Sequence, residues 1–230
     1  MKPQVILLEL QDVPIYKQLQ IEEAILRTDD RNWCIVNSGS TPAIVMGISG
    51  KREQLVTEEA TLPVYKRFSG GGTVVVDEST CFVSTIFNHD AVPIDPFPQQ
   101  VLHWNGELYK GLLGDKYQVI ENDYALGTRK FGGNAQYFTK TKWLHHTTLL
   151  WDYDPEKMRL LRHPPKMPQY REDRQHHDFL CTLKPLFPDK RAFVKGIIES
   201  ITQAFHISTE CDWEEVLARP HRKATQKIPR

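Results

Sequence analysis

Two glycine-rich stretches hold the residues of this chain whose types and spacing could do chemistry. In the first, VYKRFSGGGTVVVD, the residues Lys66, Arg67 and Ser69 precede three consecutive glycines, and β-branched runs stand on both sides. Three glycines between two strands are entropically costly, so they suit a place where backbone approaches another molecule or where several N–H groups face one anion. A flexible hairpin loop accounts for the same pattern, and for the glycines alone it is the simpler interpretation.

The second stretch, ENDYALGTRKFGGNAQ, places a charged turn at Asn122 and Asp123, one hairpin away from Lys130. A lysine beside a Gly132-Gly133 turn can act as a point charge for a phosphate, with backbone N–H groups nearby. Asp123 could hold a magnesium ion through one carboxylate, because this ion keeps waters and shares phosphate oxygens. A surface cation on a hairpin and a plain Asx turn explain the same residues, so both interpretations stay open.

Short β-type runs alternate with amphipathic segments along the chain. The predicted strands are Val5–Leu10, Trp33–Asn37, Ala43–Ile48, Cys81–Phe87, Tyr117–Ile120, Tyr124–Leu126, Lys130–Phe131 and Leu144–Trp151. The predicted helices are Ile15–Arg27, Lys51–Ala60, Gln99–Leu113, Asp154–Arg162, Asp189–Phe205 and Trp213–Ala218, and 163–178 is expected to be irregular. Because the strands come in groups with helices between the groups, the fold class is α+β with a mixed or antiparallel sheet.

Composition excludes several classes of protein. The 230 residues fit one large domain, and Lys+Arg equal Asp+Glu at 29 each, so the chain has no overall basic field for nucleic acid. No segment has the apolar length of a membrane span, and four scattered cysteines without C-x-x-C spacing indicate reduced thiols. We therefore expect a cytoplasmic protein. Residues 1–220 are expected to form the domain, and 221–230 a basic, solvated and partly disordered tail.

Taken together, the two stretches resemble the lipoate-protein ligase family of the biotin and lipoate ligase superfamily. The family pattern is R-R-x-S-G-G-G-x-V-x-H-D, then N-D, then R-K-x-x-G-x-A, then H-H-G-T-L. The matching blocks here, in the same order, are KRFSGGGTVVVD from Lys66, Asn122-Asp123, RKFGGNAQ from Arg129, and HHTTLL from His145. Four ordered blocks are more specific than one glycine triplet, and they lie between residues 64 and 150 of a resemblance that covers roughly 1–210.

The resemblance implies an α+β fold with a mixed, largely antiparallel central sheet flanked by helices. It also implies a two-step reaction in which ATP and Mg²⁺ activate lipoate or octanoate to an acyl-adenylate. The acyl group then passes to a lysine of a lipoyl domain, in a 2-oxoacid dehydrogenase or a glycine cleavage H-type protein. By motif position Lys130 would be catalytic, contacting the α-phosphate and the reacting carbonyl, and Asp123 would lie beside the metal. Substrate or adenylate would contact Arg67, Ser69, Gly70, Gly71, Gly72, Val74, Val75, Asn122, Asn134, Ala135 and His146.

Three positions depart from the family pattern. Lys66 replaces the first arginine, Val76 stands in place of histidine, and Thr147 stands in place of glycine. The longer ligases also carry a small carboxy-terminal domain that helps adenylation, and only about twenty residues follow 210 here. We therefore expect that activation could require a separate accessory partner.

Two alternatives to the ligase remain. An ATP-independent octanoyl or lipoyl transferase would act through a cysteine thioester. Relatives that work this way have the cysteine either shortly before the N-D-like segment or well after the lysine, and Cys181 matches the second position. A small core thiol is the more frequent role of such a cysteine. The second alternative is a non-catalytic protein that binds lipoyl domains or acyl chains; the lost histidine favours it, whereas Lys130 argues against it.

Overall fold

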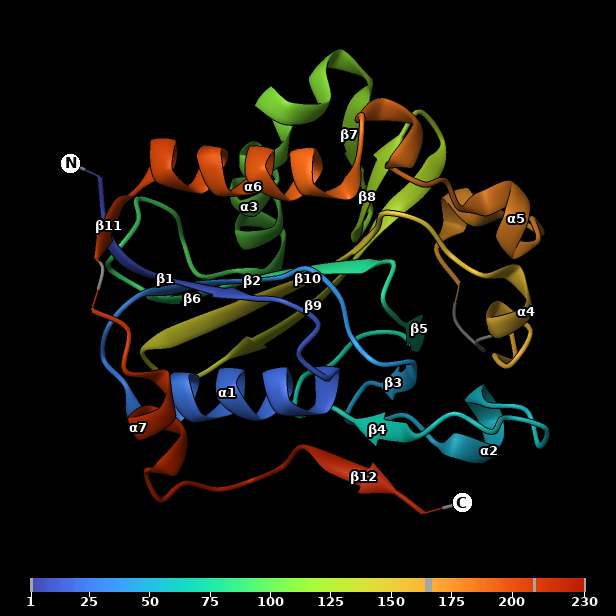
Figure 1. Ribbon diagram of the computed structural model, residues 1–230, viewed down its shortest axis with the longest axis horizontal. Helices are drawn as coiled ribbons and strands as arrows, with labels where there is room; N and C mark the ends of the chain where they lie inside the picture. The colour runs from blue at the N-terminus through green and yellow to red at the C-terminus, as the bar shows by residue number, and fades with distance from the viewer. Residues whose placement is uncertain (1, 164–166, 209, 230) are drawn as a thin grey trace.

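The computed structural model describes residues 2–163, 167–208 and 210–229, and within them two sheets and the helices around them form the fold (Figure 1). The strands of the larger sheet are β1 (Gln4–Leu10), β2 (Trp33–Asn37), β6 (Thr80–Asn88), β7 (Tyr117–Ile120), β8 (Asp123–Leu126), β9 (Arg129–Phe138), β10 (Lys142–Leu150) and β11 (His206–Ser208). Their order is β11-β1-β2-β6-β10-β9-β8-β7. Only the pairings of β1 with β11 and β2 are parallel, which confirms the prediction of a mixed, largely antiparallel sheet.

The smaller sheet has the order β12-β4-β3-β5. Its strands are β3 (Ala43–Met46), β4 (Val64–Lys66), β5 (Val74–Val76) and β12 (Gln226–Ile228). The helices are α1 (Ile15–Thr28), α2 (Arg52–Leu55), α3 (Pro98–Leu113), α4 (Pro155–Met158), α5 (His176–Phe179), α6 (Lys190–Ala204) and α7 (Trp213–Ala218). Short 3₁₀ turns occupy Gly114–Lys116, Gln169–Arg171 and Lys184–Leu186.

Helices cover both faces of the larger sheet. In Figure 1, α3 and α6 lie above it and α1 and α7 below it. The core on the α3 and α6 side contains Phe87 stacked on Trp143, and the core on the α1 side contains Trp33 and Phe68. Because both faces are covered, all nine residues of β10 are buried, the polar ones as well as the apolar ones.

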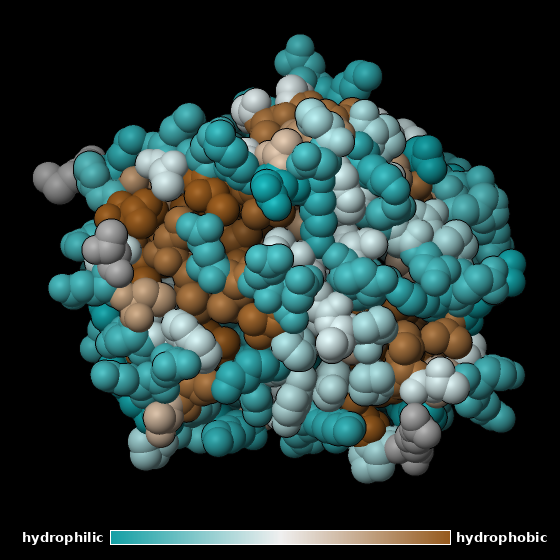
Figure 2. Space-filling view, viewed as in Figure 1, coloured by the Kyte–Doolittle hydropathy of each residue, from teal (hydrophilic) through white to brown (hydrophobic). Residues whose placement is uncertain are grey.

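Apolar surface gathers at one open edge of the larger sheet. Figure 2 shows it between α6 and α1, where β1 lies in Figure 1. β11 pairs only with residues 4–6 of β1, so the second half of β1 has β2 as its single strand neighbour in the described part of the chain. Among the described residues, no helix combines the length and apolar character needed to cross a membrane.

The triple-glycine stretch is not a hairpin, which corrects the expectation from sequence. β4 and β5, on either side of the glycines, do not pair with each other, because β3 lies between them. The connection from Arg67 to Thr73 therefore crosses over the end of β3. At this crossing Gly47 meets the loop so closely that a Cβ on Gly47 would lie 2.3 Å from the Gly71 carbonyl oxygen.

The Gly132-Gly133 pair is also not a turn. It lies inside β9, which runs for ten residues instead of the two predicted, and β9 pairs with β10 from Gly132 to Phe138. The physical reason is close packing, since a Cβ on Gly132 would lie 3.2 Å from the Tyr124 side chain of β8. Glycine here permits an approach between strands that any side chain would hinder.

Three further expectations differ from the structure. The predicted helices over 51–60 and 154–162 shorten to α2 and α4. The segment 163–178, expected to be irregular, includes a 3₁₀ turn and the start of α5, and its residues 164–166 lie outside the described residues.

Part of the carboxyl-terminal segment packs against the rest of the fold. Gln226–Ile228 forms β12 against β4. The buried Glu23 carboxylate of α1 accepts hydrogen bonds from the backbone N–H groups of Ala224 and Thr225 at 2.8 and 3.0 Å, and from the Thr225 hydroxyl at 2.9 Å. A buried carboxylate with these partners fixes the chain end to α1.

Candidate functional site

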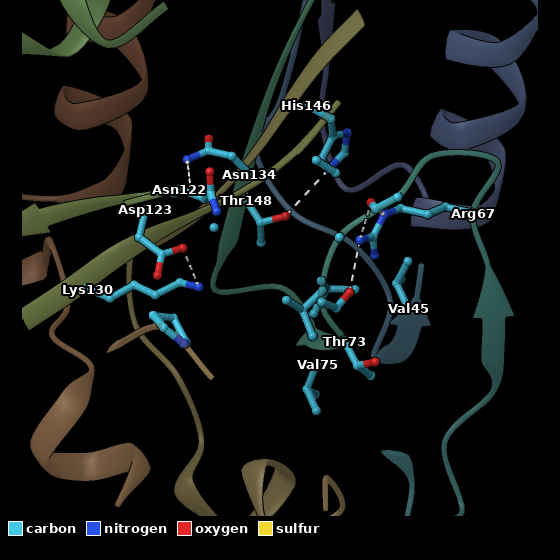
Figure 3. A pocket seen from close by; sticks show the side chains of 18 of the residues that line it. Val45, Arg67, Thr73, Val75, Asn122, Asp123, Lys130, Asn134, His146 and Thr148 are labelled. Atoms are coloured by element: carbon cyan, nitrogen blue, oxygen red, sulfur yellow. Dashed lines mark hydrogen bonds and ion pairs between the residues drawn. The ribbon is translucent and has the colours of Figure 1, made fainter. Parts of the chain in front are cut away.

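A cavity of about 660 Å³ lies between the end of the smaller sheet and β8, β9 and β10 (Figure 3). The three glycines line one side of it and Lys130 lines another, so the two glycine-rich stretches of the sequence face a single cavity. Its volume falls in the range of pockets that enclose small organic ligands.

The Arg67 guanidinium holds the glycine loop from within. Its Nε and Nη2 donate to the Gly70 carbonyl at 3.1 and 2.7 Å, and Nη2 also donates to the Gly72 carbonyl at 2.9 Å. Gly71 has φ +105°, and a Cβ there would lie 2.6 Å from Arg67 Nη2, so both its conformation and its space demand glycine. Burial lowers the pKa of Arg67 to about 10, although Glu22 opposes this shift, and the side chain remains charged at neutral pH.

One part of the cavity wall is apolar. It is formed by α1, β3, β5 and β6, through Ile15, Leu19, Val45, Val76 and Phe82. Val76, which stands where the family pattern has histidine, packs into this wall with 1% of its surface exposed. Val74 and Val75 also line the cavity. Such a wall suits a hydrocarbon chain.

A β-bulge aims Lys130 into the cavity. Ala125 pairs with Lys130 but Tyr124 pairs with Gly132, so Phe131 is one extra residue in β9. Without it, strict alternation would place Lys130 and Gly133 on opposite faces of the sheet. With it they share a face, and a Cβ on Gly133 would lie 3.4 Å from Lys130 Nζ.

Lys130 is held by a carboxylate on the neighbouring strand. Its Nζ lies 2.8 Å from Asp123 Oδ1, and the two side chains are 22% and 7% exposed. Asp123 Oδ2 accepts a hydrogen bond from the Tyr170 hydroxyl at 2.9 Å. Burial and the Asp123 charge raise the pKa of Tyr170, so this phenol is a donor at neutral pH. The ammonium is thus oriented and largely covered, and it retains donors for a ligand.

The two adjacent histidines of β10 have different surroundings. His146 lines the cavity, and its Nδ1 donates to Glu22 at 2.9 Å. Ser84 also donates to Glu22, at 2.6 Å. Burial alone would raise the pKa of Glu22, but His146 and these hydrogen bonds lower it, so the carboxylate is ionised.

His145 points to the opposite face, toward α3. The Tyr124 hydroxyl donates to the Leu102 carbonyl at 2.9 Å, which leaves its oxygen to accept from His145 Nε2 at 3.1 Å. Gln136 Nε2 donates to His145 Nδ1 at 2.9 Å. Both ring nitrogens are therefore satisfied in the neutral form, and burial, with His146 adding to it, lowers the pKa of His145 to about 3.

Of four further site residues predicted from the sequence, three line the cavity and one lies outside its lining. Asn122, Asn134 and Ala135 line the cavity, and Asn134 Nδ2 donates to the Asn122 carbonyl at 3.0 Å. Ser69 is buried but is not among the lining residues. Thr147, which replaces the family's glycine, donates to Asn134 Oδ1 at 2.8 Å and so fixes that amide.

Many lining residues were not selected by the sequence reasoning, and Arg171 and His176 are two of them that can carry a positive charge. Both lie in the segment that was expected to be irregular. The adjacent His176 and His177 are on one short helix. The only sequence signal was the density of basic residues in this segment. Among the described residues, no group of three His, Cys, Asp or Glu side chains could hold a metal ion.

Cys181 lies outside the cavity lining. Its Sγ donates to the Arg129 carbonyl at 3.3 Å, and burial, opposed by Arg129, raises the pKa of this thiol. Since a nucleophilic cysteine needs a lowered pKa and access to substrate, this geometry does not favour thioester chemistry at Cys181.

Solved structures with this fold include proteins described as lipoate-protein ligases. A lipoate-protein ligase A bound with ATP matches with a TM-score of 0.73 and 19% identity, over 95% of this chain and 93% of that one. A lipoate-protein ligase from Thermoplasma acidophilum with bound lipoic acid matches with a TM-score of 0.72 and 17% identity, over 95% and 93%. At these identities the likeness establishes the fold.

The family model of the lipoyl protein ligase A/B catalytic domain matches residues 14–206, and the chain belongs to this family. A curated relative, described as inactive lipoate–protein ligase 2 of Plasmodium falciparum, is 27% identical over 214 residues. The match covers 74% of this chain and 55% of that protein, so the chain spans about half the length of the curated relative.

Proposed function

We propose that this protein is an ATP-dependent lipoate-protein ligase. The observation that carries the proposal is the Lys130 ammonium, aimed by the β9 bulge into the same cavity that the triple-glycine loop lines. The apolar wall would take the hydrocarbon chain of lipoate or octanoate, and the glycine loop would lie along the chain and the phosphates. Val74 and Val75 would offer backbone groups to the adenine.

In the first step a carboxylate oxygen of the acid attacks the α-phosphorus of ATP, and the bond to pyrophosphate breaks. In the second, the amine of an acceptor lysine attacks the acyl carbonyl, AMP leaves, and an amide forms. Both steps build negative charge on oxygens. A fixed ammonium at those oxygens stabilises the transition state more than the ground state, which is the role we assign to Lys130.

Asp123 is the residue we assign to magnesium. Each of its two oxygens has one partner, Lys130 or Tyr170, and keeps a lone pair for an ion, so the described residues supply one carboxylate rather than a cage of ligands. That donor set fits Mg²⁺, which keeps several waters and takes substrate phosphate oxygens as ligands. A bound ion would neutralise part of the phosphate charge. Asn122, Asn134, Ala135 and His146 would complete the wall around the substrate, and Ser69 would support the loop from beneath.

The acceptor we propose is a lipoyl domain of a 2-oxoacid dehydrogenase or of a glycine cleavage H-type protein. A structural neighbour from Thermoplasma acidophilum, with a TM-score of 0.73 and 19% identity, is described as a bi-partite lipoate protein ligase with its E2 lipoyl domain. We extend its two-part organisation to this chain as a proposal: residues 1–220 form the catalytic domain, and a separate accessory protein assists activation. A cytoplasmic location remains a prediction from composition.

A non-catalytic lipoyl or acyl-binding protein is the second candidate. It is favoured by Val76 in the position of the family's histidine and by a 27% identical relative that is described as inactive. An acyltransferase acting through Cys181 is less well supported, because that thiol lies outside the cavity lining.

The test combines ATP, Mg²⁺ and either lipoate or octanoate with a lipoyl domain, and follows both pyrophosphate release and the mass of the domain. A ligase releases pyrophosphate and adds one acyl group, and Lys130→Met abolishes both. Lys140→Met is the matched control, since Lys140 is exposed in the turn after β9 and does not line the cavity.

Each alternative has its own result. Acyl binding with neither product supports the binding protein. Acyl transfer without ATP that is lost in Cys181→Ser supports the transferase. Either outcome, obtained with and without the accessory partner, overturns the ligase.

A further inference from the structure

Arg171 carries a buried cationic nitrogen for which the described residues supply no partner. The residue is 4% exposed, yet its Nη2 has no hydrogen-bond partner among them. The same residue lines the cavity that contains Lys130. A buried guanidinium nitrogen without an acceptor costs about 1–3 kcal/mol or more, so this arrangement calls for an anionic oxygen.

The rest of the Arg171 side chain is fixed in place. Its Nε donates to the Arg174 carbonyl at 3.1 Å, and the guanidinium lies 5.1 Å from the centre of the Phe179 ring. The backbone N–H of Arg171 donates to the Pro168 carbonyl at 3.1 Å. Nη2 is therefore a preorganised donor rather than the end of a mobile surface side chain.

The segment that carries Arg171 is attached to β9 next to Lys130. The N–H of Cys181 donates to the Lys130 carbonyl at 2.8 Å, and Arg129 Nε donates to the Leu180 carbonyl at 3.0 Å. His176 lies within the electrostatic reach of both Arg171 and Lys130.

Two acids that line the cavity have other partners. Asp123 is paired with Lys130 and Tyr170, and Glu121 Oε1 accepts a hydrogen bond from the Tyr170 N–H at 2.9 Å. Burial and Arg174 lower the pKa of Arg171, and Tyr170 opposes this shift. Burial, with Arg171, His163 and Lys130 adding to it, lowers the pKa of His176 to about 4, so this ring is neutral at pH 7 and adds no charge of its own. Among the described residues, Arg171 Nη2 is therefore left without an acceptor, acidic or otherwise.

We propose that Arg171 binds a phosphoryl oxygen of the nucleotide, with its Nη2 as the donor. This assignment rests on the proposed function, because that function supplies ATP as the ligand. The anionic oxygen could belong to the α-phosphoryl group, which stays in the adenylate, or to the pyrophosphate that leaves. Because the donor is buried and fixed, the contact contributes affinity rather than long-range attraction.

The test is calorimetric titration of adenosine, AMP, ATP and inorganic pyrophosphate into the wild type, Arg171→Met and Arg171→Lys. Arg171→Met is expected to weaken ATP binding about 10- to 100-fold, since a charged hydrogen bond is lost, and to leave adenosine binding within about twofold. Arg171→Lys keeps a positive charge but lacks the planar guanidinium, so its ATP affinity is expected to lie between those of the wild type and Arg171→Met. Arg159→Met is the control, because Arg159 is exposed and lies outside the cavity lining.

The four probes separate the two sources of the oxygen. Equal losses for AMP and ATP assign Arg171 to the α-phosphoryl group, and losses for ATP and pyrophosphate alone assign it to the leaving group. ATP affinity within twofold of wild type in Arg171→Met overturns the proposal. So does an equal loss of adenosine and ATP binding, which shows a structural role.

The outcomes also distinguish this proposal from the function on which it rests. Arg171-dependent binding of ATP without pyrophosphate release in the presence of lipoate refutes the ligase and keeps the Arg171 contact. Acylation by Arg171→Met with an unchanged KM for ATP keeps the ligase and refutes the contact. A wild type that binds neither ATP nor pyrophosphate refutes both.

Discussion

The neutral His145 predicts a loss of stability on mild acidification. Its pKa is about 3 in the folded chain against 6.5 for a free histidine, because the ring is buried and the neighbouring His146 adds to the shift. Below pH 6.5 the unfolded chain binds a proton that the folded chain refuses, so stability falls as the pH falls from about 6.5 toward about 3. One such group lowers the free energy of unfolding by about 1.4 kcal/mol per pH unit in this window, or about 2 kcal/mol between pH 7 and pH 5.

The measurement is urea unfolding of the wild type and of His145→Gln at both pH values. His176, with a pKa of about 4, contributes a loss of the same sign to both proteins. Glu22, whose pKa is lowered from 4.5, loses its contribution mainly below pH 5, outside the measured range. The difference between the two proteins therefore isolates His145. The wild type should lose about 2 kcal/mol more than the variant on going to pH 5. Equal losses would refute a neutral, buried His145.

Four other substitutions have clear expectations. Gly132→Ala places a Cβ 3.2 Å from a β8 side chain and should cost about 1–3 kcal/mol of stability, measured by urea unfolding. Gly133→Ala places a Cβ 3.4 Å from the Lys130 side chain and near nothing else, so it should change stability by less than about 0.5 kcal/mol but slow pyrophosphate release about tenfold. A larger loss of stability in Gly133→Ala than in Gly132→Ala would contradict the bulge geometry. Arg67→Lys loses hydrogen bonds to the glycine carbonyls, and we expect a cost of about 2–4 kcal/mol and faster proteolysis of the loop. Glu23→Gln should free the carboxyl-terminal segment, seen as faster hydrogen exchange there with the main unfolding transition retained.

Residue types and short patterns were enough to predict the α+β class and most strands of the central sheet. The long strands β6 and β10 are recognisable because their apolar and β-branched residues favour strands whatever their neighbours. The site residues were predicted from the resemblance to the family, because the glycine triplet and Lys130 each had a purely structural interpretation as well. Of those predicted site residues, all but Ser69 line the cavity.

What could not be predicted depends on contacts between segments far apart in sequence. The chain does not reveal that β3 lies between β4 and β5, since sheet order is decided by tertiary packing. Gln226–Ile228 is polar, and it forms a strand only because the edge of β4 is available to it. Arg171 is visible in the sequence as one basic residue among many, and its unpartnered nitrogen appears only when the cavity is built.

The extra residue Phe131 shifts by one position which residues of β9 face each side of the sheet. Lys130 faces the cavity, whereas Phe131 and Gly132 both face the α3 side. Removing or adding one residue between 130 and 133 would leave the strand and its partners in place while rotating the ammonium from the cavity into the hydrocarbon core. An insertion or deletion between residues 130 and 133 should therefore impair activity far more than a substitution there. Related proteins that bind acyl groups without activating them can be examined for such an insertion or deletion.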